Sequence, residues 1–340
     1  MTLHLRPMHT ATSRWLALSD KGILDGSPMT GLMHQGQFVA ELAMPLTERV
    51  VLLDHQANDG WARTFALLFD PSVGFVIAHR QGTRLARHVL QGPLPHGTGD
   101  ARLTFSFDAP AKRWSLRFEY LTGDAPAVIE SHGTDPLPLQ IRDLEAVCTR
   151  TPAHCALLWF GASQGGQLPG SAPWVGLRTE IETTRGPVAA GNLRAGDVLL
   201  TLDCGPQMLR SASPLTLPAR GSFAPVLLRA PYFGERSDLL VSADQLIATT
   251  GPENEYLFDT DSVLVPAAAL VDGRTAFCDN RRSVTGAIAL DVGVPCLINA
   301  AGCVLALGHN PRQDLPLRAL KPFETLTLMS MLGRSPRYAA

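Results

Sequence analysis

Glycine and proline recur along the whole chain and divide it into short segments. The 340 residues include 30 glycines and 26 prolines, which are spread out rather than clustered. Both residue types favour turns and interrupt regular elements, so this pattern does not suit long helices. Hydrophobic residues make up 45% of the chain, which provides enough apolar surface to build folded cores. We therefore expect a globular all-β protein with about two domains.

Alternating apolar residues in the N-terminal half predict antiparallel strands. The segments LTFSFD and RWSLRFEY place an apolar residue at every second position, with DAPAK as the turn between them. The apolar runs FALLFD and GFVIAHR flank a turn signal at 71–74, which predicts a hairpin. The spacing in LQIRDLEAVC predicts one short helix, with Asp143 and Glu145 facing outward. We predict an irregular lead-in over 1–35 and a jelly-roll-like β-sandwich over 36–161. This sandwich resembles lectin-like and laminin-G-like jelly rolls.

A second all-β region follows a connector. Residues 162–173, ASQGGQLPGSAP, are small, polar and rich in glycine and proline, which is typical of an exposed linker. Short strand patterns then recur from 174 to 308. In the tail, 309–340, Pro322 suits the first turn of a short helix, and Phe323, Leu326 and Met329 are spaced to share its buried face.

The motifs of this second region identify a family resemblance. TEIETTRGPVAAGNLRAGDVLLTLDCGPQ is followed by RAPYFGERSDLLVSADQLIA and then by VLVPAAALVDGR. In this order they resemble the Hint fold, which hedgehog C-terminal domains and inteins share. The likeness is closest to a bacterial group with an R-x-G-D-x-V/L-x-T turn and a D-L-L-V-S strand. It extends from Trp174 to Gly308.

The resemblance implies self-processing chemistry at two positions. In the family, a first-residue Cys or Ser attacks the carbonyl before it, and a His in the strand after V-S protonates the departing nitrogen. Trp174 and Gln245 stand at these positions, and residues 174–308 contain no histidine. An indole forms no acyl intermediate, and a carboxamide has no titrating proton near neutral pH. The resemblance therefore predicts a Hint domain without catalytic residues.

Other groups near this region leave an alternative open. In a shifted register Ser171 would attack the Gly170 carbonyl, giving residual self-cleavage near 170–174. Asp197 and Asp244 are predicted to be turn and surface carboxylates rather than acids in catalysis. Cys204 and Cys303 have no partnering histidine and are predicted core thiols.

The N-terminal half offers weaker candidates for a site. Trp61, in DGWART, is the candidate exposed aromatic for ligand binding, whereas Trp114 is predicted to be a core residue. Four histidines lie near charged residues, and each is predicted to be a surface or packing residue: His55, His79, His88 and His132. GASQG matches a nucleophile-elbow pattern only by letters, because no helix pattern follows it. The six cysteines lack C-x-x-C spacing, so we expect no metal site and no cofactor.

Charge and hydropathy limit the classes of partner. A formal net charge of −2 argues against nucleic-acid binding. The sequence has no apolar run near 18 residues and no readable classical signal, so we expect no membrane span. The expected location is cytoplasmic, or exported without a classical signal peptide. Together these patterns predict a structural or interaction module that binds a protein partner or itself, with a glycan as a further candidate ligand of the sandwich.

Overall fold

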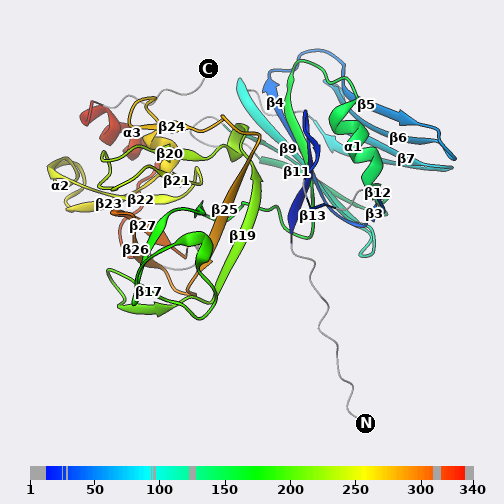
Figure 1. The fold of residues 1–340 in the computed structure, drawn as a ribbon. Coiled ribbons are helices and arrows are strands. Elements are labelled where there is room, and N and C mark those ends of the chain that lie inside the picture. The colour runs from blue at the N-terminus through cyan, green and yellow to red at the C-terminus, as the bar shows by residue number, and fades with distance from the viewer. Residues whose placement is uncertain are drawn as a thin grey trace, which may run out of the picture. The chain divides into compact units, whose positions relative to one another are not determined.

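The chain folds into antiparallel sheets with a few short helices, as the computed structural model in Figure 1 shows. The structure describes residues 13–24, 26–27, 30–92, 94, 97–121, 128–308 and 315–333. Contacts divide the chain into an N-terminal unit, Met1–Pro169, and a C-terminal unit, Gly170–Ala340. The all-β class predicted from the turns and alternating strands is confirmed.

The N-terminal unit contains two larger antiparallel sheets. The first runs in the order β11 (Val128–Thr134), β10 (Arg113–Tyr120), β9 (Gly99–Asp108), β4 (Gln35–Met44), β13 (Leu157–Gln164), β1 (Arg14–Leu18) and β2 (Gly22–Ile23). The second is a meander of β5 (Val50–Ala57), β6 (Arg63–Asp70), β7 (Gly74–Gln81) and β8 (Arg84–Gln91). The short strands β3 (Leu32–Met33) and β12 (Leu139–Gln140) form a separate pair.

One apolar core joins these two sheets. Phe75 of β7 stacks on Phe118 of β10 with ring centroids 5.5 Å apart, and Phe65 of β6 meets Phe38 of β4 at 4.9 Å. All four side chains are at most 3% exposed. Burying a side chain of this size stabilises the fold by roughly 1.5–3 kcal/mol. The unit is therefore a β-sandwich, while its jelly-roll connectivity stays a prediction.

The predicted helix of this unit is present as α1 (Ile141–Thr149). It buries Ile141, Leu144 and Val147, the three residues whose spacing predicted it. It contacts β5 and β12, as Figure 1 also shows. The prediction that Asp143 faces outward is wrong, because its side chain is only 15% exposed and pairs with Arg63.

Two boundary predictions are corrected in the described residues. The predicted irregular lead-in contains β1, in which Trp15 and the three residues after it are buried. Because both faces of this strand are covered, its sequence shows no alternation. The predicted linker begins too early, since β13 continues to Gln164 and buries Ala162 and Ser163.

The C-terminal unit also contains two antiparallel sheets. One has the order β19 (Ser211–Pro218), β25 (Val284–Asp291), β14 (Val175–Gly176), β21 (Leu239–Val241), β20 (Val226–Leu228) and β24 (Ala276–Cys278). The other has the order β18 (Pro206–Met208), β17 (Val198–Leu200), β15 (Glu180–Thr183), β26 (Cys296–Ala300), β27 (Cys303–Leu307), β22 (Leu246–Thr250) and β23 (Ser262–Pro266), with β16 (Gly186–Ala189) paired to β15. A short helix, α2 (Pro252–Phe258), connects β22 and β23.

The predicted short helix near the C-terminus is α3 (Pro322–Met331). Pro322 begins it, and the Glu324 side chain accepts a hydrogen bond from the Lys321 N–H, which satisfies a free donor at the helix start. Leu328 and Met329 pack into the core of the C-terminal unit. The predicted face is partly wrong, because Phe323 is 61% exposed.

Candidate functional site

Trp174 occupies a closed position at the start of β14. The strand that follows it is central in its sheet, because Val175 pairs with Val241 on one side and Ile288 on the other. The Trp174 residue is 3% exposed. Its N–H donates to Ser242 Oγ at 3.2 Å, and its carbonyl accepts from the Ser242 N–H at 3.1 Å. Both backbone groups of Trp174 are thus held by one serine.

Gln245 lies three residues after that serine, in the turn between β21 and β22. Its N–H donates to the Ser242 carbonyl at 3.1 Å, which closes the turn. The side chain is fully buried, and its Nε2 donates to the carbonyls of Ala306 at 2.8 Å and Leu246 at 3.1 Å. Its Oε1 has no hydrogen-bond partner among the described residues. The carboxamide therefore ties two strands together and offers no proton for catalysis.

A cleft of about 390 Å³ is lined by the residues on the N-terminal side of Trp174. It is lined by Ala172 and Pro173 together with Arg210 and Asp291. Neither Trp174 nor Gln245 lines it. The Ser171 side chain is exposed, and no described residue forms a hydrogen bond with its hydroxyl. The structure thus places Ser171, the nucleophile of the self-cleavage alternative, in solvent rather than beside a base.

Asp197, Asp244 and Cys303 lie where a structural role predicts them, whereas Cys204 does not. Asp197 accepts a hydrogen bond from the Arg194 N–H at 2.8 Å within a turn, and Asp244 is exposed. Cys303 is buried, and burial raises the pKa of its thiol to about 12. The prediction that Cys204 belongs to the core is wrong, because it is exposed at the β17–β18 turn. All six cysteines are free.

A second candidate site is a cleft between α1 and β5 in the N-terminal unit, with a volume of about 620 Å³. Its polar wall is built on Arg63, whose side chain is only 2% exposed. Arg63 Nε donates to Asp143 Oδ2 at 2.8 Å, and a second guanidinium nitrogen donates to Asp59. These hydrogen bonds raise the pKa of Arg63, and the bond to Asp143 has the largest effect. The hydrogen bond from Arg63 lowers the pKa of Asp59.

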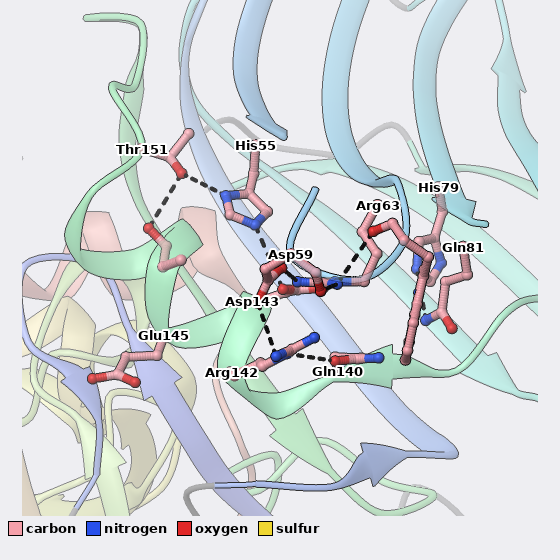
Figure 2. A network of polar contacts seen from close by, with 12 residues as sticks. His55, Asp59, Arg63, His79, Gln81, Gln140, Arg142, Asp143, Glu145 and Thr151 are labelled. Atoms are coloured by element: carbon pink, nitrogen blue, oxygen red, sulfur yellow. Dashed lines mark hydrogen bonds and ion pairs between the residues drawn. The ribbon is translucent and has the colours of Figure 1, made fainter. Parts of the chain in front are cut away.

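His55 completes this wall from β5. Its Nδ1 lies 3.3 Å from Thr151 Oγ1, which itself donates to the Ala146 carbonyl at 3.2 Å. The Thr151 oxygen is therefore the acceptor, and His55 Nδ1 carries a proton. His55 Nε2 is buried without a hydrogen bond, 3.8 Å from Asp143 Oδ1. Figure 2 shows His55 between Thr151 and Asp143. Burial of Asp143 raises the pKa of its carboxyl group, but the contacts with His55 and Arg63 outweigh this effect and lower the pKa.

Trp61 lies at the edge of this network and is 47% exposed, and its role as a ligand-binding aromatic stays a prediction. The Arg63 guanidinium carbon lies over its ring at 5.4 Å from the centroid. The Trp61 carbonyl accepts a hydrogen bond from Arg63 at 3.3 Å. The same arginine thus fixes the ring and the two carboxylates.

The other histidines and Trp114 fit the packing and surface roles predicted for them. His79 and His88 are buried in the sandwich, and desolvation lowers the pKa of each to about 4. His88 lies 4.6 Å from the Phe105 ring and 4.8 Å from the Trp114 ring, so this tryptophan packs against the core. The His132 side chain is 70% exposed.

Two further features are absent from the described part of the chain. No group of three or more His, Cys, Asp or Glu side chains could hold a metal ion there. No helix there is both long and apolar enough to cross a membrane.

The comparisons with known proteins concern the C-terminal unit. Residues 177–291 match the family model described as the Hint domain. Among solved structures, the crystal structure of the gp41-1 intein matches with 12% identity, covering 40% of this chain and 98% of that one. Its TM-score of 0.27 is too low to carry an argument about the fold. No curated protein matches. The family model confirms the motif-based prediction: the C-terminal half of this chain contains a Hint domain.

Proposed function

We propose that the Hint domain of this protein is a scaffold that does not cleave its own backbone, joined to a ligand-binding sandwich. The observation that carries this proposal is the pair of side chains at the expected reaction centre. Trp174 stands where the family has its nucleophile, and the fully buried Gln245 stands where it has its acid. Both are held by hydrogen bonds to the surrounding strands.

The chemistry of amide cleavage explains why this pair matters. A nucleophile must attack the Pro173 carbonyl carbon, and the Trp174 nitrogen must then leave with a proton. Trp174 carries no hydroxyl or thiol for the attack. Gln245 donates both of its described hydrogen bonds to backbone carbonyls and does not titrate. A positioned acid typically contributes 10²–10⁴-fold to such a step, so its absence would slow cleavage by that factor.

Residual self-cleavage is the alternative, and it requires Ser171 to attack the Gly170 carbonyl. Its solvent-exposed side chain has no hydrogen-bonded base in the described residues, so the local geometry favours the non-cleaving scaffold.

Intact mass spectrometry separates the two functions. We expect one species at 36.5 kDa after long incubation with a thiol, because nothing activates either bond. A Ser171→Ala variant should behave in the same way. Two fragments that divide the wild-type chain near residue 170, and that disappear in Ser171→Ala, would establish self-cleavage instead.

Partners of the scaffold follow from its lack of catalytic groups. We propose that it binds a protein or a second copy of itself, with ligand recognition assigned to the N-terminal sandwich. The net charge of −2 does not favour nucleic acid as that partner. The proposed location is the cytoplasm, or the outside of the cell after export without a classical signal peptide.

A further inference from the structure

We infer that the cleft between α1 and β5 binds an uncharged saccharide, with Trp61 as an aromatic contact at its edge. This inference rests on the proposed ligand-binding role of the sandwich and assigns that role to particular residues. It is carried by three features of the cleft: its balanced charge, its fixed polar wall and the half-exposed indole beside that wall.

The charges that line the cleft nearly cancel. Three arginines face four carboxylates there: Arg63, Arg142 and Arg150 against Asp54, Asp59, Asp143 and Glu145. An anionic ligand would meet the carboxylates, and a cationic ligand would meet the guanidinium groups. A neutral ligand with many hydroxyls avoids both penalties, because each hydroxyl donates one hydrogen bond and accepts others.

Most of the wall is held rigid before any ligand arrives. Arg63 is fixed by Asp59 and Asp143, while Arg142 is fixed by Asp59 at 2.9 Å and by Gln140 at 2.8 Å. Figure 2 shows Arg142 between these last two partners. Fixed groups lose little conformational entropy on binding, which favours affinity for a small ligand.

Polar groups remain available on this wall. The carboxylate of Glu145 and the guanidinium of Arg150 line the cleft and form no hydrogen bond with another described residue. His55 Nε2 is buried at the base of the network without a hydrogen-bond partner. This nitrogen has almost no accessible surface, so the polar groups that a ligand can reach here are those of Glu145 and Arg150. These groups supply both acceptors and donors, as vicinal hydroxyls require.

Trp61 supplies the apolar contact. The Arg63 guanidinium covers part of its ring, and nearly half of the residue stays accessible. One face of a sugar ring carries C–H groups, which pack against an aromatic ring while the hydroxyls at its rim reach polar neighbours. The exposed Trp61 indole would contact the C–H face of a sugar, and the adjacent cleft of balanced charge would contact its hydroxyls.

A glycan array tests this inference with the full-length protein. The array carries neutral oligosaccharides as one set and sialylated and sulfated ones as another. We expect binding to members of the neutral set. Trp61→Ala and Glu145→Ala should each weaken it about tenfold or more, since each removes one contact that faces the ligand. Tyr256→Ala, which removes an exposed aromatic from the C-terminal unit, should leave it unchanged.

Each other outcome overturns the inference. The inference is wrong if the protein retains no glycan or binds the charged set alone. It is also wrong if wild type, Trp61→Ala and Glu145→Ala bind equally. Thermal unfolding of both variants should match the wild type, because Glu145 lines the open cleft and nearly half of Trp61 is exposed. Intact mass is independent of this assay, so failure here would leave the non-cleaving scaffold standing.

Discussion

At the scale of single residues, Gln245 and Trp174 support the proposal that the Hint domain does not cleave its own backbone. Motif order alone predicts that both stand at the reaction centre, because a short linear pattern surrounds each of them. Their surroundings could not be predicted, since the hydrogen bonds to Ser242 and Ala306 join segments distant in sequence. Gln245 now contributes to stability, because its buried amide bonds two strands.

His79 and His88 give a residue-scale prediction about pH. Both are buried as neutral rings, and desolvation lowers each pKa from 6.5 to about 4. For His79, the neighbouring His88 adds to this lowering, while Asp143 opposes it. The unfolded chain therefore binds more protons than the folded chain between these values. Stability is full above pH 6.5 and falls as the pH decreases to about 4, by about 3 kcal/mol per histidine.

His88→Phe measures this effect against a control. Phenylalanine suits the aromatic surroundings of His88 and does not titrate. We expect the variant to lose roughly half of the stability change between pH 7 and pH 4, whereas His132→Asn should retain all of it. Tryptophan fluorescence in urea follows the transition, because four of the five tryptophans belong to the N-terminal unit. Identical pH profiles for wild type and His88→Phe would contradict this assignment.

At the scale of elements, alternation and helical spacing predicted the strands and the helix that have one side in the core and the other side toward solvent. The β9–β10 pair and α1 each bury one side, so their sequences carry a clear period. Strand β1 buries both sides and carries none. The cleft between α1 and β5 was missed for another reason: its residues lie some 80 positions apart, and Asp143 resembles any outward-facing helix acid until Arg63 is placed beside it.

The Arg63 pairing gives a prediction for these elements. Arg63→Ala removes the partner that joins α1 to the start of β6 and leaves the Asp143 carboxylate in a largely buried site. We expect a loss of about 3 kcal/mol in the unfolding free energy of the N-terminal unit, measured by urea denaturation at pH 7.

Arg142→Ala is the matched control for that change. It also removes an arginine from Asp59, but its side chain is 43% exposed and it makes no described contact with Asp143. Its loss should cost less than about 1 kcal/mol. Equal losses in the two variants would show that the buried pairing with Asp143 does not stabilise the fold.

For the whole molecule, the sequence predicted an all-β chain with a Hint domain in its C-terminal half, and both are confirmed. The core of the C-terminal unit also includes residues of the predicted tail, among them Leu320 and Leu328. The sequence motifs that predicted the Hint domain end before these residues. The sequence therefore did not predict that tertiary packing places them in the core. A complete scaffold around a reaction centre without reactive groups is the central claim of this account.

Restoring the two missing groups tests that claim most directly. Wild type, Trp174→Cys, Gln245→His and the double variant are incubated in parallel with thiol, and intact masses are followed over time. We expect wild type and Gln245→His to stay whole and Trp174→Cys to cleave at most slowly. The double variant should cleave before residue 174 about 10²-fold faster than Trp174→Cys. Wild-type fragments ending at residue 170 or 173 would contradict the account, as would a folded double variant that stays whole.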